Sequence, residues 1–256
     1  EGGYEFNFPL MLAQGYLVCV PDVHFRQGET ARSFVDCIEG AADEISKRAY
    51  VDSTRFGASG GSFGGYATNC LAALSKKFKA LVPISSLSDL VSNYGLNTEI
   101  TENRQVRMGI SFGTDPQGYL KNSPIAYVRN ITTPLLIVHG AQDGNCNPQQ
   151  AIEFFISLRR EGKKAWMAWY PEEGHGINQP DSQRDLYMRM TQFYDHYLKG
   201  SPAAKWMTDS LPIWNRSAKD GFDPESVGIT PGVGLNTNED IQRSILYLKS
   251  KVNSKK

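Results

Sequence analysis

The sequence predicts an α/β domain: a mostly parallel sheet with helices on both faces. Its 256 residues are 40% hydrophobic, which suits the buried core of one such domain. Short apolar runs alternate with amphipathic helical stretches, and no internal repeat or low-complexity linker interrupts them before about residue 200. This alternation is typical of parallel sheets covered by helices on both faces.

Five apolar runs are expected to form the strands. They lie at residues 16–21, 55–60, 78–85, 134–140 and 164–170. The run at 16–21 (YLVCVP) is expected to be buried, together with its Cys19. Because ligands of parallel sheets bind beyond the carboxyl ends of the strands, we expect chemistry just after these runs.

Helical spacing of apolar residues predicts the connecting helices. They lie at residues 33–48, 66–74, 147–162 and 182–199. Asn147 is expected to cap the third of these, with Pro148 at its first position, and Gly200 to end the fourth. Residues 86–130 are polar and irregular, long enough for a functional excursion above the sheet.

Charge and composition exclude several function classes. Lys and Arg total 27 and Asp and Glu total 27, so no net charge favours nucleic acid or an anionic membrane. No apolar run approaches the roughly 18 residues that span a bilayer. The four cysteines lack metal-ligand spacing and are expected to be free thiols, with the first three buried. They are Cys19, Cys37, Cys70 and Cys146.

The glycine-rich stretch GASGGSFGGY at 57–66 contains G-x-S-x-G twice, centred on Ser59 and on Ser62. Such a serine is often a nucleophile on a sharp strand-to-helix turn. With Ser59 at the turn, the helix would begin with four glycines in six residues, each costing about 1 kcal/mol relative to alanine. With Ser62 at the turn, the preceding strand has normal length and Gly60 and Gly64 allow close passage. We therefore predict Ser62.

A serine nucleophile needs a base, and the base needs an orienting carboxylate, in the order Ser, acid, His. Among four histidines, His175 lies in a glycine-flanked loop (PEEGHGI) after the last strand. His24 precedes Ser62, and His139 and His196 are expected to be packing or surface residues.

Two carboxylates compete for the role of the acid. Asp143 follows the strand at 134–140, whereas Asp89 is expected to cap a helix, so we favour Asp143. In this interpretation the backbone N–H of Phe63 is one oxyanion donor.

The segments GGSFGGY, HGAQDGNCNPQQA and WYPEEGHGI, in this order, resemble the catalytic domain of the prolyl oligopeptidase and dipeptidyl peptidase family. The resemblance covers residues 10 to 207 and implies an α/β-hydrolase fold and a serine peptidase acting on short peptides without metal or organic cofactor. Ser62, Asp143 and His175 match its triad. Asn145 matches a residue that holds a substrate carbonyl, and Tyr94 lies in the excursion that lines the specificity pocket.

The resemblance also implies parts that this sequence does not show. Family members carry a β-propeller before this domain, and a second oxyanion donor from a Tyr in an early glycine-rich loop, for which Tyr4 is a poor substitute. We expect an N-terminally truncated catalytic domain at 1–207, lacking its first strands, and a tail of unknown role at 208–256. The family's habits suggest a periplasmic or secreted protein.

Two other functions stay open at this point. A carboxylesterase would use the same triad, and ester against peptide turnover would separate the two enzymes. A catalytically weak binding domain of the same fold is the second, although the three triad residue types in the right order argue against it.

Overall fold

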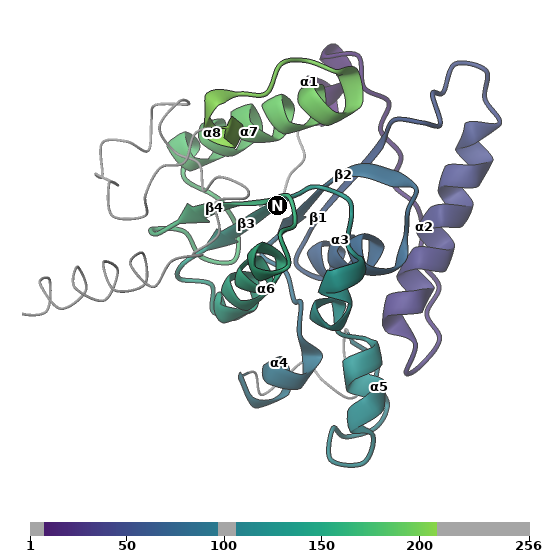
Figure 1. Ribbon diagram of the computed structural model, residues 1–256, viewed down its shortest axis with the longest axis vertical. Coiled ribbons are helices and arrows are strands. Elements are labelled where there is room, and N and C mark those ends of the chain that lie inside the picture. Colours follow the sequence, from purple (N-terminus) through teal and green to yellow (C-terminus); the bar gives the residue numbers. More distant parts are fainter. Residues whose placement is uncertain (1–7, 97–105, 209–256) are drawn as a thin grey trace, which may run out of the picture.

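The computed structural model describes residues 8–96 and 106–208, and within them a parallel sheet lies between two layers of helices (Figure 1). Its strands are β1 (Phe56–Gly61), β2 (Phe78–Ile84), β3 (Leu135–Gly140) and β4 (Ala165–Tyr170). Their order in space is β1-β2-β3-β4 and every pairing is parallel. Parallel strands bring their carboxyl ends to one edge, so the loops after them meet there.

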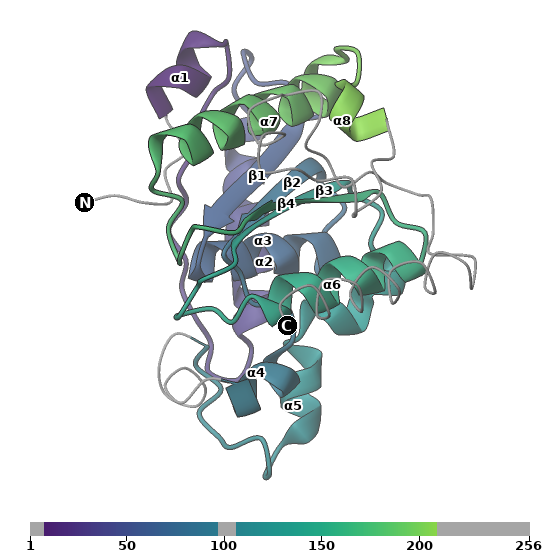
Figure 2. The ribbon, with the colours of Figure 1, turned by 90° about the vertical axis from the view of Figure 1, so that its left-hand side faces the viewer.

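Helices cover both faces of the sheet, as the sequence predicts. Helices α7, α1 and α8 lie on one face, and α2, α3 and α6 on the other (Figure 2). Their bounds are α1 Phe8–Ala13, α2 Thr30–Ser46, α3 Phe63–Leu74, α6 Gln149–Arg160, α7 Pro180–Lys199 and α8 Lys205–Thr208. The excursion holds the short helices α4 (Leu90–Leu96) and α5 (Pro116–Lys121) and the 3-10 helix η1 (Pro124–Asn130).

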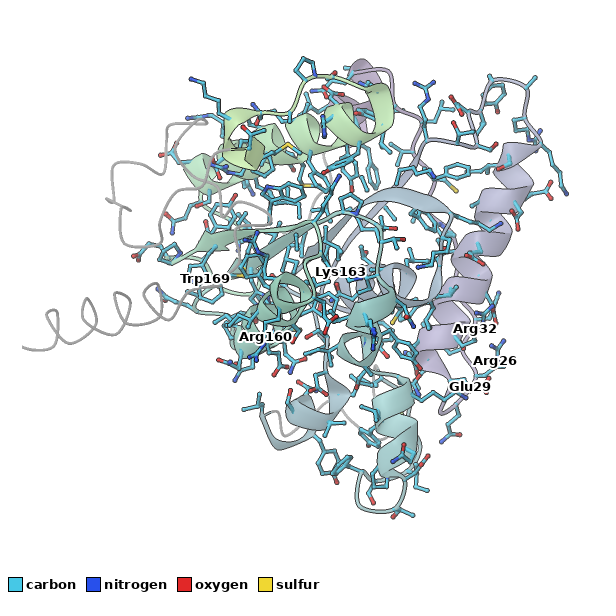
Figure 3. All side chains as sticks on the ribbon, viewed as in Figure 1. Arg26, Glu29, Arg32, Arg160, Lys163 and Trp169 are labelled. Atoms are coloured by element: carbon cyan, nitrogen blue, oxygen red, sulfur yellow. The ribbon has the colours of Figure 1, made fainter. Side chains whose placement is uncertain are left out.

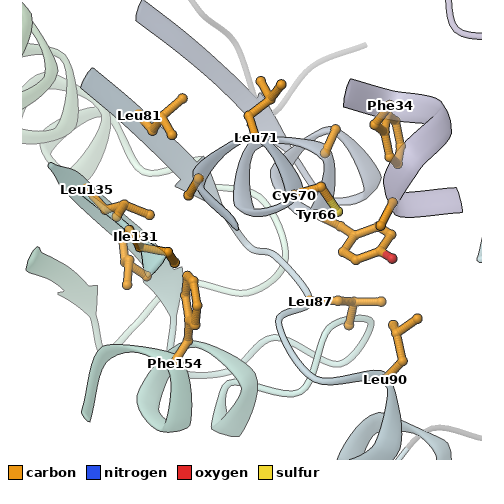
Figure 4. Close-up of a cluster of buried hydrophobic side chains, with 14 of the residues drawn as sticks. Phe34, Tyr66, Cys70, Leu71, Leu81, Leu87, Leu90, Ile131, Leu135 and Phe154 are labelled. Carbon is orange, nitrogen blue, oxygen red and sulfur yellow. The ribbon is translucent and has the colours of Figure 1, made fainter. Parts of the chain in front are cut away.

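The core consists of two hydrophobic clusters, one on each face. Phe34 of α2, Leu71 of α3 and Phe154 of α6 pack in the cluster that holds Leu81 (Figure 4). Val82, the next residue of β2, belongs to the cluster under α7. Successive side chains of a strand point to opposite faces, so the continuous apolar sequence of β2 follows from burial on both sides.

Four of the five predicted strands are confirmed, each end within one residue. The predicted helices correspond to α2, α3, α6 and α7, but α3 begins three residues earlier than expected, at Phe63. Gly200 ends α7 with a left-handed φ of 75°, a conformation that favours glycine. Asn147 accepts a hydrogen bond from the Gln149 N–H (2.9 Å) at the start of α6.

The strand predicted at residues 16–21 is wrong. This segment has no regular structure in the described chain, Val20 is 73% exposed, and Cys19 is exposed rather than buried. An apolar run forms a strand only where a neighbour pairs with it, and here β1 lies across a cleft of about 1450 Å³. Leu17 and Val20 line this cleft together with Phe56 of β1. Among the described residues, the outer edge of β1 is therefore unpaired.

The charged side chains labelled in Figure 3 lie at the periphery. Near the start of α2, Arg26 pairs with Glu29 (2.9 Å) and Arg32 with Asp36 (2.6 Å). Exposed pairs of this kind add little stability. None of the helices within 8–96 and 106–208 has the length and apolar character needed to cross a membrane. Tyr4 and the predicted tail from residue 209 onward lie outside the described residues.

Candidate active site

Ser62 occupies the turn between β1 and α3. Its backbone has φ 57° and ψ −119°, a conformation that side chains with a Cβ rarely adopt and that often marks functional turns. The Ser62 N–H donates to the Ile84 carbonyl at 2.9 Å, which holds the turn to β2. Ser59 lies inside β1 and donates its hydroxyl to the Val82 carbonyl (2.9 Å). The prediction that Ser62, not Ser59, is the turn residue is confirmed.

Close packing across this turn requires glycine at position 60. A Cβ on Gly60 would lie 2.5 Å from the carbonyl carbon of Gly64 and 2.9 Å from its Cα. Gly64 itself has open space where its own Cβ would be. The glycines of GGSFGGY therefore have different roles: Gly60 lets β1 and α3 meet, and Gly65, whose Cβ would lie 2.5 Å from the Ile84 carbonyl oxygen, lets α3 approach β2.

Asp143 lies in the loop after β3 and is buried. Its Oδ1 accepts hydrogen bonds from the N–H groups of Asn145 and Cys146, both at 2.8 Å. These donors fix the carboxylate while leaving both oxygens within reach of another partner. That partner is His175, whose Nδ1 lies 2.9 Å from Oδ1 and 2.8 Å from Oδ2.

The loop that carries His175 follows β4 and is held by Glu173. The buried Glu173 carboxylate accepts hydrogen bonds from the N–H groups of Asn178 and Gln179, both at 3.0 Å. Its carbonyl accepts a bond from the Gln142 N–H (2.9 Å), which ties this loop to the Asp143 loop. A Cβ on Gly140 would meet the backbone of Glu173 and Gly174, so the two loops pack without space for a side chain there.

The His175 ring bridges the other two residues. Its Nε2 lies 2.9 Å from Ser62 Oγ, on the side opposite to Asp143. Burial lowers the pKa of His175 below its ordinary value, which favours the neutral imidazole. The three side chains that the sequence selected thus form a continuous hydrogen-bonded chain from the serine to the carboxylate.

The alternatives to these residues lie elsewhere. Asp89 caps α4, where its Oδ1 accepts the Val91 N–H at 2.8 Å, as expected. His196, near the end of α7, has its Nδ1 2.7 Å from the Ser201 carbonyl, and His24 is exposed. His139 is fully buried, as expected of a core residue, but its Nε2 is also 3.1 Å from Asp143 Oδ2. Sequence reasoning missed this contact.

The residue predicted for the oxyanion hole and the two predicted to bind substrate occupy different surroundings. Phe63 is the first residue of α3, and its ring packs against Phe34 with centroids 4.8 Å apart. Asn145 is exposed in the loop of Asp143. Tyr94 of α4 packs against Phe112 and Tyr119, both at 5.6 Å between ring centroids, which places it in the aromatic cluster of the excursion.

No group of three or more His, Cys, Asp or Glu side chains that could hold a metal ion occurs in the described part of the chain. The cysteines there are free thiols, with Cys70 and Cys146 buried. The thiol of Cys146 interacts with the Ser62 side chain, and burial raises the pKa of this thiol to about 12. A thiol of this kind is protonated at neutral pH and a poor nucleophile.

A serine on a strained strand-to-helix turn, beside a histidine and an acid from later loops of a parallel sheet, defines the α/β-hydrolase class. The chain belongs to the prolyl oligopeptidase family of serine-type peptidases, whose family model matches residues 3–201.

Individual relatives agree with this family. The uncharacterized peptidase YuxL of Bacillus subtilis is 28% identical over 211 residues, which covers 76% of this chain and 32% of that protein. Dipeptidyl-peptidase 5 of Porphyromonas gingivalis is 29% identical over 215 residues, or 77% and 31% of the two chains. The structure of Pyrococcus horikoshii acylaminoacyl peptidase superimposes with a TM-score of 0.63 at 25% identity, covering 70% of this chain and 30% of that one. The chain thus spans about a third of the length of the relatives it matches.

Proposed function

We propose that this chain is the catalytic part of a serine peptidase that hydrolyses short peptides through an acyl-enzyme on Ser62. The observation that carries the proposal is the chain of contacts from Ser62 Oγ to His175 Nε2 (2.9 Å) and from His175 Nδ1 to the Asp143 carboxylate (2.8 and 2.9 Å). Family membership supports the reaction class.

The proposed mechanism begins with proton transfer. Asp143 can only accept a hydrogen bond, so the neutral His175 carries its hydrogen on Nδ1 and presents an unprotonated Nε2 to the Ser62 hydroxyl. His175 takes the hydroxyl proton as Ser62 Oγ attacks the substrate carbonyl carbon. Asp143 stabilises the imidazolium that results.

The tetrahedral intermediate then collapses. The N–H of Phe63, at the start of α3, is placed to donate to the developing oxyanion, and the helix N-terminus adds favourable electrostatics. His175 gives its proton to the leaving amine, and the acyl group stays on Ser62. Water, deprotonated by His175, attacks the ester carbon, and its proton returns to Ser62 Oγ as the acid product leaves.

Substrate recognition involves residues outside the triad. We propose that Asn145, next to the Asp143 loop, holds a substrate carbonyl and that Tyr94 lines the specificity pocket. The relatives are a dipeptidyl-peptidase and an acylaminoacyl peptidase, so dipeptide anilides and N-acyl amino acid anilides are the first substrates to compare. We also propose that the active protein includes a further segment, because this chain spans about a third of its relatives.

A fluorophosphonate probe tests the nucleophile directly. After labelling, tryptic digestion yields the peptide 56–76, which contains both candidate serines, and fragmentation by mass spectrometry assigns the modified one. We expect the label on Ser62, its loss in Ser62→Ala and its retention in Ser59→Ala. Wild-type protein that unfolds cooperatively but carries no label on Ser62 would contradict an activated serine.

A further inference from the structure

A second histidine contacts the acid of the proposed triad. His139, in β3, is fully buried, and its ring stacks near Trp169 of β4, labelled in Figure 3, with centroids 6.5 Å apart and planes at 29°. Its Nε2 lies 3.1 Å from Asp143 Oδ2 and 3.0 Å from the Cys146 carbonyl oxygen. Asp143 therefore lies between two imidazole rings.

The protonation of His139 follows from its neighbours. A carboxylate and a carbonyl can only accept, so Nε2 carries a hydrogen and donates to both. The other ring nitrogen, Nδ1, is buried and has no hydrogen-bond partner among the described residues. A proton on Nδ1 would leave an unsatisfied N–H in the core, which is unfavourable. The arrangement thus favours a hydrogen on Nε2 of His139.

The hydrogen bonds to Asp143 are divided between its two oxygens. Oδ1 accepts the Asn145 and Cys146 N–H groups and also lies 2.9 Å from His175 Nδ1. On Oδ2 the only donors within the described chain are the two imidazole rings, His139 and His175. Without His139, the only donor left to Oδ2 within the described chain is His175. The carboxylate could then rotate, and its negative charge would act on His175 undiminished.

We propose that His139 is a positioning residue, whose Nε2–H holds Asp143 Oδ2 so that the carboxylate keeps the orientation that serves His175. The proposal rests on the proposed function of Ser62, Asp143 and His175. His139 touches no reacting atom and acts through Asp143. Its hydrogen bond to Asp143 reduces how strongly the carboxylate stabilises the imidazolium form of His175. The base therefore stays neutral and able to accept the serine proton.

Two substitutions separate the hydrogen bond from the packing. His139→Phe keeps a flat ring against Trp169 but removes the N–H. His139→Gln is the matched variant, because its amide nitrogen can supply an N–H to Asp143 from a similar distance along the side chain. A role in packing alone predicts that phenylalanine is the better replacement, whereas the proposed role predicts glutamine.

The first readout is the NMR titration of the His175 ring, which does not depend on activity. Four histidines in the chain make its assignment tractable. The titratable groups around Asp143 are His139, His175 and Cys146, and the Cys146 thiol stays protonated over the range measured. We expect His139→Phe to raise the His175 midpoint by about 0.5 pH unit or more, because the full charge of Asp143 then favours the imidazolium. His139→Gln should leave it within about 0.2 unit.

The second readout is the fluorophosphonate labelling rate at Ser62, measured at pH 6. We expect roughly a tenfold loss in His139→Phe and less than threefold in His139→Gln, the size expected for one charge-assisted hydrogen bond. Equal midpoints in the two variants, or a larger shift in His139→Gln, would overturn the proposal. If His139→Phe does not fold, His139→Asn is tested in its place, because its side chain is too short to reach Asp143. Failure of the wild type to label would count against the proposed function, whereas the titration still decides on His139.

Discussion

Replacing Gly60 by alanine perturbs the turn that presents Ser62. The new Cβ would lie 2.5 Å from the Gly64 carbonyl carbon and 2.9 Å from its Cα, whereas ordinary carbon contacts are about 3.5–4.0 Å. The obstacle is backbone, so the first turn of α3 must move by about 1 Å to relieve it. Overpacking of this kind costs about 1–3 kcal/mol of stability.

The same displacement changes the geometry of the proposed nucleophile. A shift of about 1 Å can reduce a rate by about a hundredfold, because attack and proton transfer need close alignment. We therefore expect Gly60→Ala to unfold at lower urea concentration than wild type and to label with fluorophosphonate about a hundredfold more slowly.

Gly64→Ala is the matched control for this prediction. Apart from its chain neighbours and the backbone of its own helix, no heavy atom lies within 4 Å of the position of its Cβ. Alanine in a helix is favoured over glycine by about 0.5–1 kcal/mol. Gly64→Ala should be as stable as wild type or more so. Urea unfolding followed by tryptophan fluorescence measures both variants, and labelling kinetics measure the site. A Gly60→Ala protein with wild-type stability and labelling rate would refute the reasoning.

Three further outcomes follow from the site. Because burial lowers the pKa of His175, the neutral base should persist to lower pH than an ordinary histidine allows. The rate of peptide hydrolysis should therefore fall only as pH drops below about 6.5. A midpoint of the pH–rate profile above 7 would contradict this. Glu173→Gln weakens the acceptor for two loop N–H groups, so kcat should fall by about tenfold with KM nearly constant. The control is Glu172→Gln at the exposed neighbouring residue, which should change neither kcat nor KM. In native protein at pH 7, iodoacetamide should alkylate the exposed Cys19 and leave the buried Cys146 unmodified. Peptide mapping measures both modifications. Rapid modification of Cys146 would mean that its loop opens.

Local sequence patterns predicted most of the sheet because its strands are buried on both faces. The strands β2, β3 and β4 are short apolar runs bounded by polar or glycine residues, and their length and boundaries favour a strand over a buried helix. The run at 16–21 has the same composition but no neighbouring strand in the described chain, so its pattern alone was misleading. Strand formation depends on a partner that periodicity does not encode.

The candidate site was predictable to the extent that chain order constrains it. Ser62 was selected by the cost of glycine in a helix, and Asp143 and His175 by their positions after strands. The contact of His139 with Asp143 was missed because it forms across the bend between β3 and its loop, where neither helical nor strand spacing applies. The spacing of four residues in HGAQD was the available signal. This spacing predicts a contact between His139 and Asp143 only when the geometry of the loop is known.

The unpaired outer edge of β1 has a consequence for handling the protein. Ser62 directly follows β1, an edge strand whose outer side, among the described residues, borders a cleft rather than a neighbouring strand. Such an edge is a template on which another polypeptide can form main-chain hydrogen bonds. Copies that associated through this edge would also alter the strand that supports the nucleophile, so we expect association to show as a change of labelling rate with protein concentration. Labelling rates compared across a dilution series belong with every kinetic measurement made on this chain.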